Sequence, residues 1–139
     1  MKATAALVAA ALSVVNLSAR ANDNEAIAKA QAAATKWLAQ IDGTRYGPSW
    51  DEAAALFKAA VTKSDWEKSM AAVRAPLGAL KVRTLKSGNF MRTLPGAPDG
   101  AYVVIQYETT FANKASAVET VTPMLDKDGA WRISGYYIR

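Results

Sequence analysis

Histidine and cysteine, the side chains that most often act as acid–base groups, nucleophiles and transition-metal ligands, are both absent from this chain of 139 residues. The side chains that remain for chemistry are carboxylates, lysines, hydroxyls and tyrosines. Residue types alone therefore assign no catalytic residue, no metal ligand and no cofactor, and a binding protein is favoured over an enzyme.

Two carboxylates, Glu108 and Glu119, fall on neighbouring predicted strands, diagonally placed at about 7 to 8 Å if the strand register holds. Paired carboxylates at comparable separations carry out glycoside hydrolysis, so a carboxylate-based hydrolase is a remote alternative. Solvated carboxylates, or carboxylates paired with Arg132 or Lys114, are the favoured interpretation, because catalytic carboxylates need burial to shift their pKa values.

The segment Asp126-Lys127-Asp128-Gly129 resembles part of a calcium-binding loop, but a full loop needs more oxygen ligands and a distal glutamate. Asp-Gly between apolar runs is instead a strong hairpin signal, because both central residues of a type I′ turn have positive φ. We therefore expect a two-residue turn at Asp128-Gly129 and no metal.

Three apolar-rich segments, residues 101–111, 117–126 and 130–139, predict antiparallel strands. The expected turn sets Thr122 opposite Gly135, and a loop at residues 112–117 sets Ile105 opposite Met124. Alternation along each strand then gives two faces, which a one-residue slip would exchange. The face without charge, which the helices should cover, holds Val103, Ile105, Tyr107, Thr109, Phe111, Val118, Thr120, Thr122, Met124, Trp131, Ile133 and Tyr137. The mixed outer face holds Tyr102, Val104, Gln106, Glu108, Thr110, Glu119, Val121, Leu125, Arg132, Ser134, Tyr136 and Ile138.

A group of hydroxyls on the charge-free face is the candidate ligand site. A mostly apolar pocket with a few converging polar groups is typical of small-molecule sites. The alternative is that threonine and tyrosine favour strands and that their hydroxyls bond to backbone or water. The predicted ligand-binding residues are Tyr107, Thr109, Thr120, Thr122 and Tyr137, with Trp50 and Trp66 at the mouth of the cavity. The other two tryptophans, Trp37 and Trp131, are interpreted as core residues rather than as part of a sugar-stacking box.

The first 21 residues have the pattern of a secretory signal peptide. Lys2 supplies the positive charge, residues 3–15 form a short apolar run, and Ala19-Arg20-Ala21 is a cleavage pattern. The apolar run is shorter than the roughly 20 residues of a membrane-spanning helix, and without cysteine there is no lipid attachment site or disulfide. We expect a periplasmic or secreted product without a membrane anchor, formed by a single domain of residues 22–139.

Charge disfavours nucleic acid as a partner. Removal of Lys2 and Arg20 lowers the formal charge from +5 to +3, and the remaining basic residues are scattered singly. Nucleic-acid-binding proteins concentrate basic side chains on one face instead.

Three amphipathic helices are expected before the sheet. The first spans residues 22–41, with a capping box of Asn22 and Glu25 and an apolar stripe at helical spacing. The second and third are expected to begin at Ser49 and Ser64, each followed three residues later by a glutamate, and the third should stop before Pro76. Residues 77–93 are interpreted as a hairpin that turns at Ser87-Gly88-Asn89, and residues 94–100 as a loop. Helices followed by four or five antiparallel strands give an α+β fold, with three helices packed on a curved sheet.

Several motifs together resemble the bacterial secreted family catalogued as domain of unknown function 4019. They are Trp37-Leu38, Ser49-Trp50, VRAPLG at residues 73–78, LPGAPDGAY at residues 94–102, Lys114, ETV at residues 119–121 and GAWRISGY at residues 129–136. The resemblance covers nearly the whole chain after residue 21, and it implies a cone-shaped fold like the nuclear transport factor 2-like and cystatin-like folds. It implies no activity and no catalytic residues.

Two main hypotheses about function follow. The first is a non-enzymatic module that binds a small, neutral or apolar ligand between helices and sheet. The second is a homodimeric envelope protein that associates through the outer sheet face, because an exposed apolar patch of that kind often marks an interface. The residues of this second surface are Tyr102, Val104, Val121, Leu125, Tyr136 and Ile138.

Overall fold

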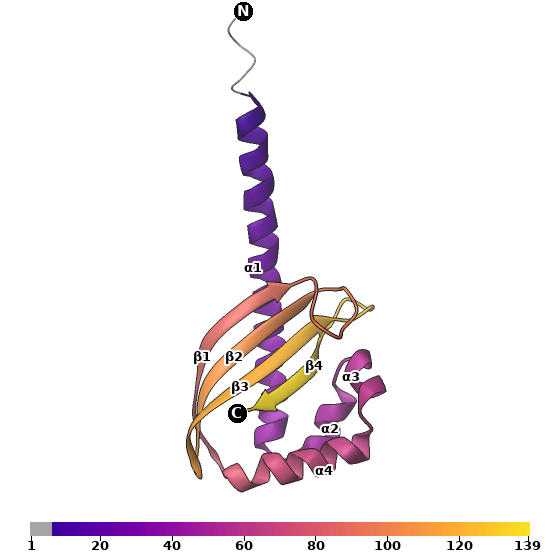
Figure 1. Cartoon of the computed structure of the whole chain (residues 1–139), viewed down its shortest axis with the longest axis vertical. Helices are drawn as coiled ribbons and strands as arrows, with labels where there is room; N and C mark the ends of the chain where they lie inside the picture. The colour runs from indigo at the N-terminus through magenta and orange to yellow at the C-terminus, as the bar shows by residue number, and fades with distance from the viewer. Residues whose placement is uncertain (1–6) are drawn as a thin grey trace, which may run out of the picture.

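The computed structural model describes the backbone of residues 7–139 and the side chains from residue 20 onward. The helices come first: α1 (Leu7–Asp42), α2 (Tyr46–Asp51), α3 (Ala55–Ala60), α4 (Lys63–Val73) and the 3₁₀ turn η1 (Ala75–Leu77). The strands β1 (Leu80–Met91), β2 (Tyr102–Phe111), β3 (Lys114–Leu125) and β4 (Trp131–Ile138) follow, and they form one antiparallel sheet in chain order (Figure 1). The predicted α+β class is confirmed.

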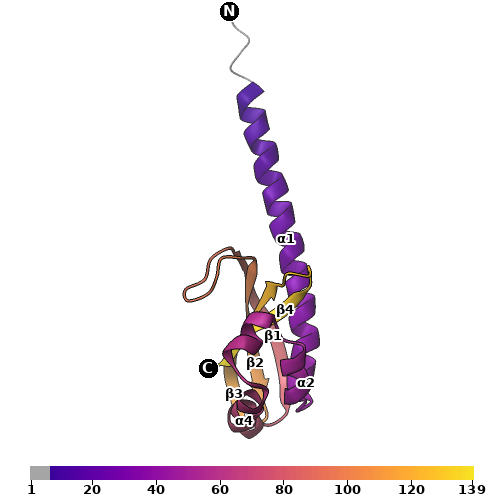
Figure 2. The same ribbon diagram turned by 90° about the vertical axis from the view of Figure 1, so that its right-hand side faces the viewer.

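Helix α1 covers one face of the curved sheet, and the loop between β1 and β2 projects on the side away from it (Figure 2). The predicted stripe of α1 is the buried one, because residues at helical spacing share one side of the helix. Ala30, Ala34, Trp37, Leu38 and Ile41 are all buried in the core. Of the part of the chain that the structure describes, no helix is long and apolar enough to span a membrane.

The expected start of this helix at Asn22 is wrong, because α1 runs without a break from Leu7. The residues around Asn22 are alanine-rich and contain no proline or glycine, so nothing in them stops a helix. The first six residues of the expected signal peptide lie outside the described residues.

The second and third capping boxes are also wrong. Ser49 lies inside α2, where its hydroxyl donates to the carbonyl of Tyr46 at 2.6 Å. The expected helix is also interrupted by a break between α2 and α3. At this break the N–H of Ala54 donates to the carbonyl of Ile133 on β4 at 2.9 Å. Helix α4 is capped by Thr62, whose hydroxyl accepts from the N–H of Asp65 at 3.2 Å, rather than by Ser64. It ends at Val73, before Pro76, as predicted.

Residues 77–93 form no hairpin. Ser87-Gly88-Asn89 lies within the continuous strand β1, which pairs with β2 along its length and has irregularities near residues 81 and 86. The glycine is explained by the helix above it. A Cβ at Gly88 would lie 3.1 Å from Nε2 of Gln31 and 3.4 Å from Cγ2 of Ile27, so the close approach of α1 leaves little room for a side chain.

The register between β2 and β3 differs from the expected one by three residues. The connection is only Ala112-Asn113, so Phe111 faces Lys114 and Ile105 faces Val121 instead of Met124. An odd shift exchanges the two faces of a strand, because side chains alternate with a period of two. All of β3 is therefore turned over relative to the prediction.

The register between β3 and β4 is half right. Thr122 faces Gly135 and Thr120 faces Tyr137, as predicted. The connecting loop has three residues rather than two, since Asp126 and Ala130 still pair and only Gly129 has positive φ (85°). An irregularity at Pro123 absorbs the extra residue, because proline has no N–H to donate to the ladder.

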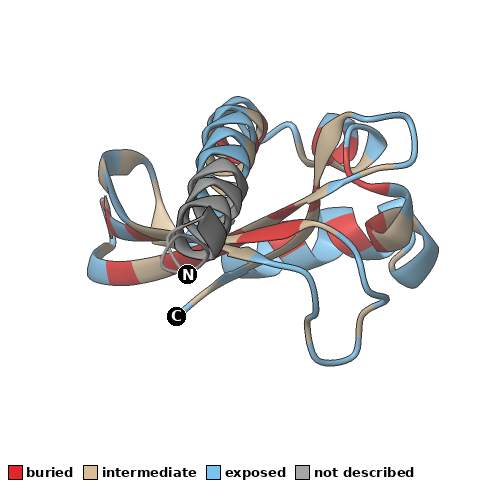
Figure 3. Cartoon of the chain, turned by 90° about the horizontal axis from the view of Figure 1, so that it is seen from above, coloured by how far each residue is buried: buried red, intermediate tan, exposed pale blue. Residues whose placement is uncertain are grey.

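The core fills the space between α1, the shorter helices and the sheet. Its aromatic centre holds Trp37, whose ring centroid lies 6.0 Å from that of Trp66 and 5.3 Å from that of Tyr136. Figure 3 shows the buried residues along the strands and on the helix surfaces that face them. Val121 is fully buried in this core, so β3 contributes to it the side chains that were predicted to face outward.

Candidate functional site

The predicted hydroxyl patch is divided by the sheet and does not exist as one site. Tyr107 and Thr109 are buried on the helix-covered face. The turned-over β3 carries Thr120 and Thr122 to the opposite face, and Tyr137, paired with Thr120, goes with them and is 55% exposed.

The four tryptophans occupy different positions. Trp66 is buried, and its indole N–H donates to the hydroxyl of Ser49 at 2.9 Å, so it is a core residue rather than part of a cavity mouth. Trp50 is half-buried and donates to the carbonyl of Val61 at 2.8 Å. Trp37 is in the core as expected and donates to the carbonyl of Ser49 at 2.8 Å. Trp131 packs only partly against the core and lines a cleft.

The proposed carboxylate pair is wrong, because its members lie on opposite faces. Glu108 is exposed on the outer face, and its nearest cation is Lys86 at 4.0 Å. Glu119 is fully buried on the helix-covered face. The register shift of three residues is the cause, since it moved only one of the two strands to the other face.

The predicted outer-face patch is wrong for two reasons: the register shift turns Val121 inward, and the loop before β2 covers Tyr102. Tyr102 is fully buried with its hydroxyl bonded to the carbonyl of Pro98, and Val121 is fully buried in the core. Tyr136 packs against the core, whereas Leu125 stays 40% exposed near the hairpin. The six residues therefore do not form one exposed patch.

Glu119 stands at the centre of a buried polar network. Its Oε1 accepts from Nε of Arg83 at 2.7 Å and from the hydroxyl of Thr109 at 2.6 Å. Its Oε2 accepts from Nη2 of Arg83 at 3.1 Å and from the hydroxyl of Tyr136. The donors come from β1, β2 and β4, so the carboxylate joins three strands to its own.

A second carboxylate completes the network at the end of α1. Asp42 accepts from Nη1 and Nη2 of Arg83 at 2.8 and 2.9 Å, and it contacts Nη2 of Arg74 at 3.4 Å. Arg74 is itself buried, with its guanidinium over the ring of Phe111 at 4.3 Å. Two arginines thus balance two carboxylates, which is the arrangement that lets charges be buried.

The environment of this network holds the Tyr136 phenol and the Arg83 guanidinium each in one protonation state. Burial raises the pKa of the Tyr136 phenol far above its ordinary value, and the Glu119 carboxylate adds to the rise. Burial lowers the pKa of Arg83, but its hydrogen bonds to Asp42 and Glu119 outweigh this and raise it overall. These groups are suited to holding the fold together rather than to exchanging protons.

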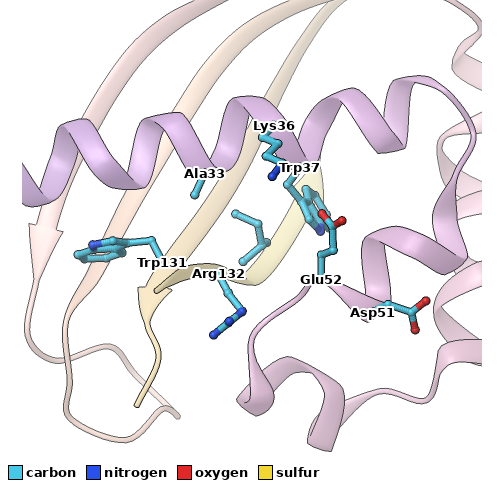
Figure 4. Close-up of a pocket in the computed structure, with 8 residues that line it drawn as sticks. Ala33, Lys36, Trp37, Asp51, Glu52, Trp131 and Arg132 are labelled. Atoms are coloured by element: carbon cyan, nitrogen blue, oxygen red, sulfur yellow. The ribbon is translucent and has the colours of Figure 1, made fainter. Parts of the chain in front are cut away.

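Two clefts open near the start of β4. The α3–hairpin cleft has a volume of about 650 Å³, lies between α3, the 98–100 loop and the β3–β4 hairpin, and is mostly apolar. It is lined by Ala55, Leu56, Ala59, Pro98, Asp99, Gly100, Tyr102, Met124, Leu125, Asp126, Lys127, Asp128 and Arg132. The α1–β4 cleft has a volume of about 380 Å³ and mixes aromatic with charged side chains. It is lined by Ala33, Lys36, Trp37, Asp51, Glu52, Trp131, Arg132 and Ile133 (Figure 4).

Arg132 lines both clefts and is fixed by the hairpin. Its Nη1 bonds to Asp128 at 2.8 Å and to Asp126 at 3.2 Å, and its Nη2 bonds to Asp128 at 2.8 Å. The guanidinium of Arg132 lowers the pKa of Asp128 to about 2. In the segment Asp126–Gly129, which resembles part of a calcium loop, the two carboxylates therefore bind the guanidinium of Arg132.

Sequence reasoning missed the network and both clefts. Arg83 is a single basic residue in a predicted strand, and Asp42 is the last residue of a helix, so neither carries a local signal. The two clefts are built from segments far apart in the chain, which only the tertiary fold brings together. The predicted loop at residues 94–100 is present, and residues 98–100 line the larger cleft.

Residues 33–136 match the family described as "Protein of unknown function (DUF4019)". Because the match covers most of the sequence, the chain belongs to this family, and the resemblance predicted from its motifs is confirmed. No curated protein and no solved structure matches the chain. The likeness to the nuclear transport factor 2-like and cystatin-like folds therefore stays an expectation.

Proposed function

We propose that this protein is a non-enzymatic module that binds a small, largely apolar molecule in the α3–hairpin cleft. The observation that carries the proposal is the size and character of this cleft, whose volume of about 650 Å³ falls within the range of small-molecule sites. Its wall includes Leu56, Ala59 and Met124, and its rim carries charges that could orient a polar end of the ligand.

A binding role fits the state of the buried acid groups. Glu119 is the fully buried carboxylate among the residues that the structure describes, and both of its oxygens already accept two hydrogen bonds. A group satisfied in this way stabilises the fold, whereas a general acid or base needs a proton-transfer partner from the substrate within reach.

The test uses native mass spectrometry of the protein purified from the cells that make it. We expect an additional mass that is lost on denaturation. Ala59→Trp should remove that mass because the indole fills the cleft, while Ala60→Trp on the same helix should keep it, because Ala60 is exposed and does not line the cleft. Likewise, the fluorescence of 1-anilinonaphthalene-8-sulfonate should be enhanced by the wild type and by Ala60→Trp, but not by Ala59→Trp. Equal behaviour of the two variants would refute this cleft as the site.

We also propose that the protein is exported and that its signal peptide is removed after Ala21. The support is the charged start, the short apolar run and the Ala19-Arg20-Ala21 pattern. N-terminal sequencing of the protein from a periplasmic extract should begin at Asn22. A chain that retains Met1 would contradict the proposal.

A further inference from the structure

The α1–β4 cleft differs in chemistry from the apolar cleft on which the proposed function rests. Figure 4 shows Trp131 at one end, Asp51 and Glu52 toward the other, and Lys36 entering from α1. Trp131 is only partly buried where it packs against the core, and its side chain lines the cleft. An aromatic surface is thus combined with hydrogen-bond donors and acceptors in one small concave space.

Only some of the charged residues of this cleft form ion pairs within the protein. Asp51 pairs with Lys63 at 3.0 Å, and Arg132 is held by the two aspartates of the hairpin. Over residues 20–139, Lys36 and Glu52 form no ion pair within 4.0 Å. The ammonium group offers three donors and the carboxylate several acceptor sites, and these point to a ligand that both donates and accepts.

We propose that the α1–β4 cleft binds a small saccharide. A sugar ring has an apolar face of C–H groups, which can lie against the Trp131 indole, and a rim of hydroxyls. Those hydroxyls can accept hydrogen bonds from Lys36 and donate them to Glu52. A simple anion is disfavoured because two carboxylates, Asp51 and Glu52, line the same cleft.

The Trp131 side chain that lines the cleft favours a saccharide, which carries no charged groups, over a zwitterion. An amino acid or dipeptide could pair its carboxylate with Lys36 and its ammonium group with Glu52. It would leave the Trp131 ring unused, however, and the two exposed charges would each gain little from an ion pair in water. Its ammonium group could bind the face of Trp131 only by giving up Glu52, which lies toward the other end of the cleft (Figure 4).

The test is an NMR titration of the ¹⁵N-labelled full domain, in which each of the four tryptophan indoles contributes one N–H signal. The probes are N-acetylglucosamine, N,N′-diacetylchitobiose, glucose and maltose, with glycine and diglycine as zwitterionic comparators. We expect a saturable shift of the Trp131 indole and the Ala33 amide with at least one sugar, and no shift of the Trp50 indole, which is bonded to Val61 away from the cleft.

Variants then separate the proposed contacts from general effects. Glu52→Gln should weaken sugar binding about three- to tenfold, because a hydrogen bond to a carboxylate is stronger than one to an amide but this carboxylate is exposed. Trp131→Phe should retain part of the binding, and Trp131→Ala should abolish it. Glu67→Gln, an exposed substitution on α4 outside the cleft, should leave the affinity unchanged.

Three results would overturn the proposal: no saturable shift with any of the sugars, the same shifts with glycine or diglycine instead, or equal weakening by Glu67→Gln and Glu52→Gln. The result is independent of the α3–hairpin cleft, because binding there would shift the amides of Leu56 and Ala59 rather than that of Ala33.

Discussion

Replacing Glu119 with glutamine tests the role of the buried network most directly. The four groups around this carboxylate, two on Arg83 and one each on Thr109 and Tyr136, all donate hydrogen bonds. A glutamine presents one oxygen and one NH₂ group in the same space, so one side of the amide would face donors without an acceptor. The half-buried Arg83 would also lose one of its two balancing charges.

The cost of this change is set by burial. Removal of one partner from a buried ion pair destabilises a protein by about 3 to 5 kcal/mol, because it leaves the other charge uncompensated. For a domain of this size, about 4 °C of melting temperature corresponds to each kcal/mol, so Glu119→Gln should melt about 12 to 20 °C lower. Urea unfolding followed by tryptophan fluorescence would give the free energy directly.

Glu108 provides a matched control on the neighbouring strand. Its side chain is 67% exposed and lies 4.0 Å from Lys86, so Glu108→Gln should change the free energy of unfolding by no more than about 0.5 kcal/mol. The reasoning is refuted if Glu119→Gln costs less than about 1 kcal/mol, or if the two variants lose the same amount. The double variant Arg83→Met with Glu119→Leu removes one charge of each sign, so it should be more stable than Glu119→Leu alone.

Three further predictions concern pH and the β3–β4 hairpin. The carboxyl of Asp128 should titrate near pH 2 by NMR, and Arg132→Gln should return its pKa toward the ordinary 3.8. Because the pKa of Asp128 is lower in the folded state, the stability that this carboxylate contributes is present above pH 3.8 and is lost as the pH falls toward 2. Tyr136 has a raised folded-state pKa, so its contribution to stability is present below its ordinary pKa of 10 and is lost as the pH rises above that value. In urea unfolding, Tyr136→Phe should therefore lose less stability than the wild type between pH 9 and 11. At Gly129, where φ is 85°, substitution by valine should lower the free energy of unfolding by about 1 to 2 kcal/mol, and substitution by asparagine should lower it much less. The reason is that a β-branched residue strongly resists positive φ. Equal losses for the two variants would contradict the turn geometry.

The sequence was a good guide to elements whose signal is local. The stripe on α1, the end of α4 before Pro76, the strands β2 to β4 and the loop at residues 94–100 all follow from spacing or from proline and glycine chemistry. The capping boxes failed because a serine followed by a glutamate is common, and because Ser49 is needed inside α2 as a partner for Trp66. Gly88 is predicted to be a turn residue from its neighbours, but a glycine is needed there because α1, which is remote in sequence, lies close to it.

The candidate site failed at a single point, the connection between β2 and β3. The residues from Ala112 to Ala117 contain no Asn-Gly or Asp-Gly pair that would fix a turn, so the sequence leaves the register open. The choice was wrong by an odd number of residues, and this alone placed Thr120 and Thr122 beside Tyr107 and moved Glu119 to the solvent face. Burial of a glutamate could not be read from its own neighbours, because its partner Arg83 comes from another strand.

The network around Glu119 also has a consequence for how the chain folds. Its contacts join residues that are 32, 36 and 41 positions apart, from the end of α1 to β3, and Tyr136 adds a donor from the last strand. Bonds between such distant segments form only after the chain between them has closed into loops, so they belong to the late part of folding. Substitutions in the network should therefore accelerate unfolding more than they slow folding. The same charges that hold the finished domain together give no help in starting it, and the lifetime of the folded state depends on them more than the speed of reaching it.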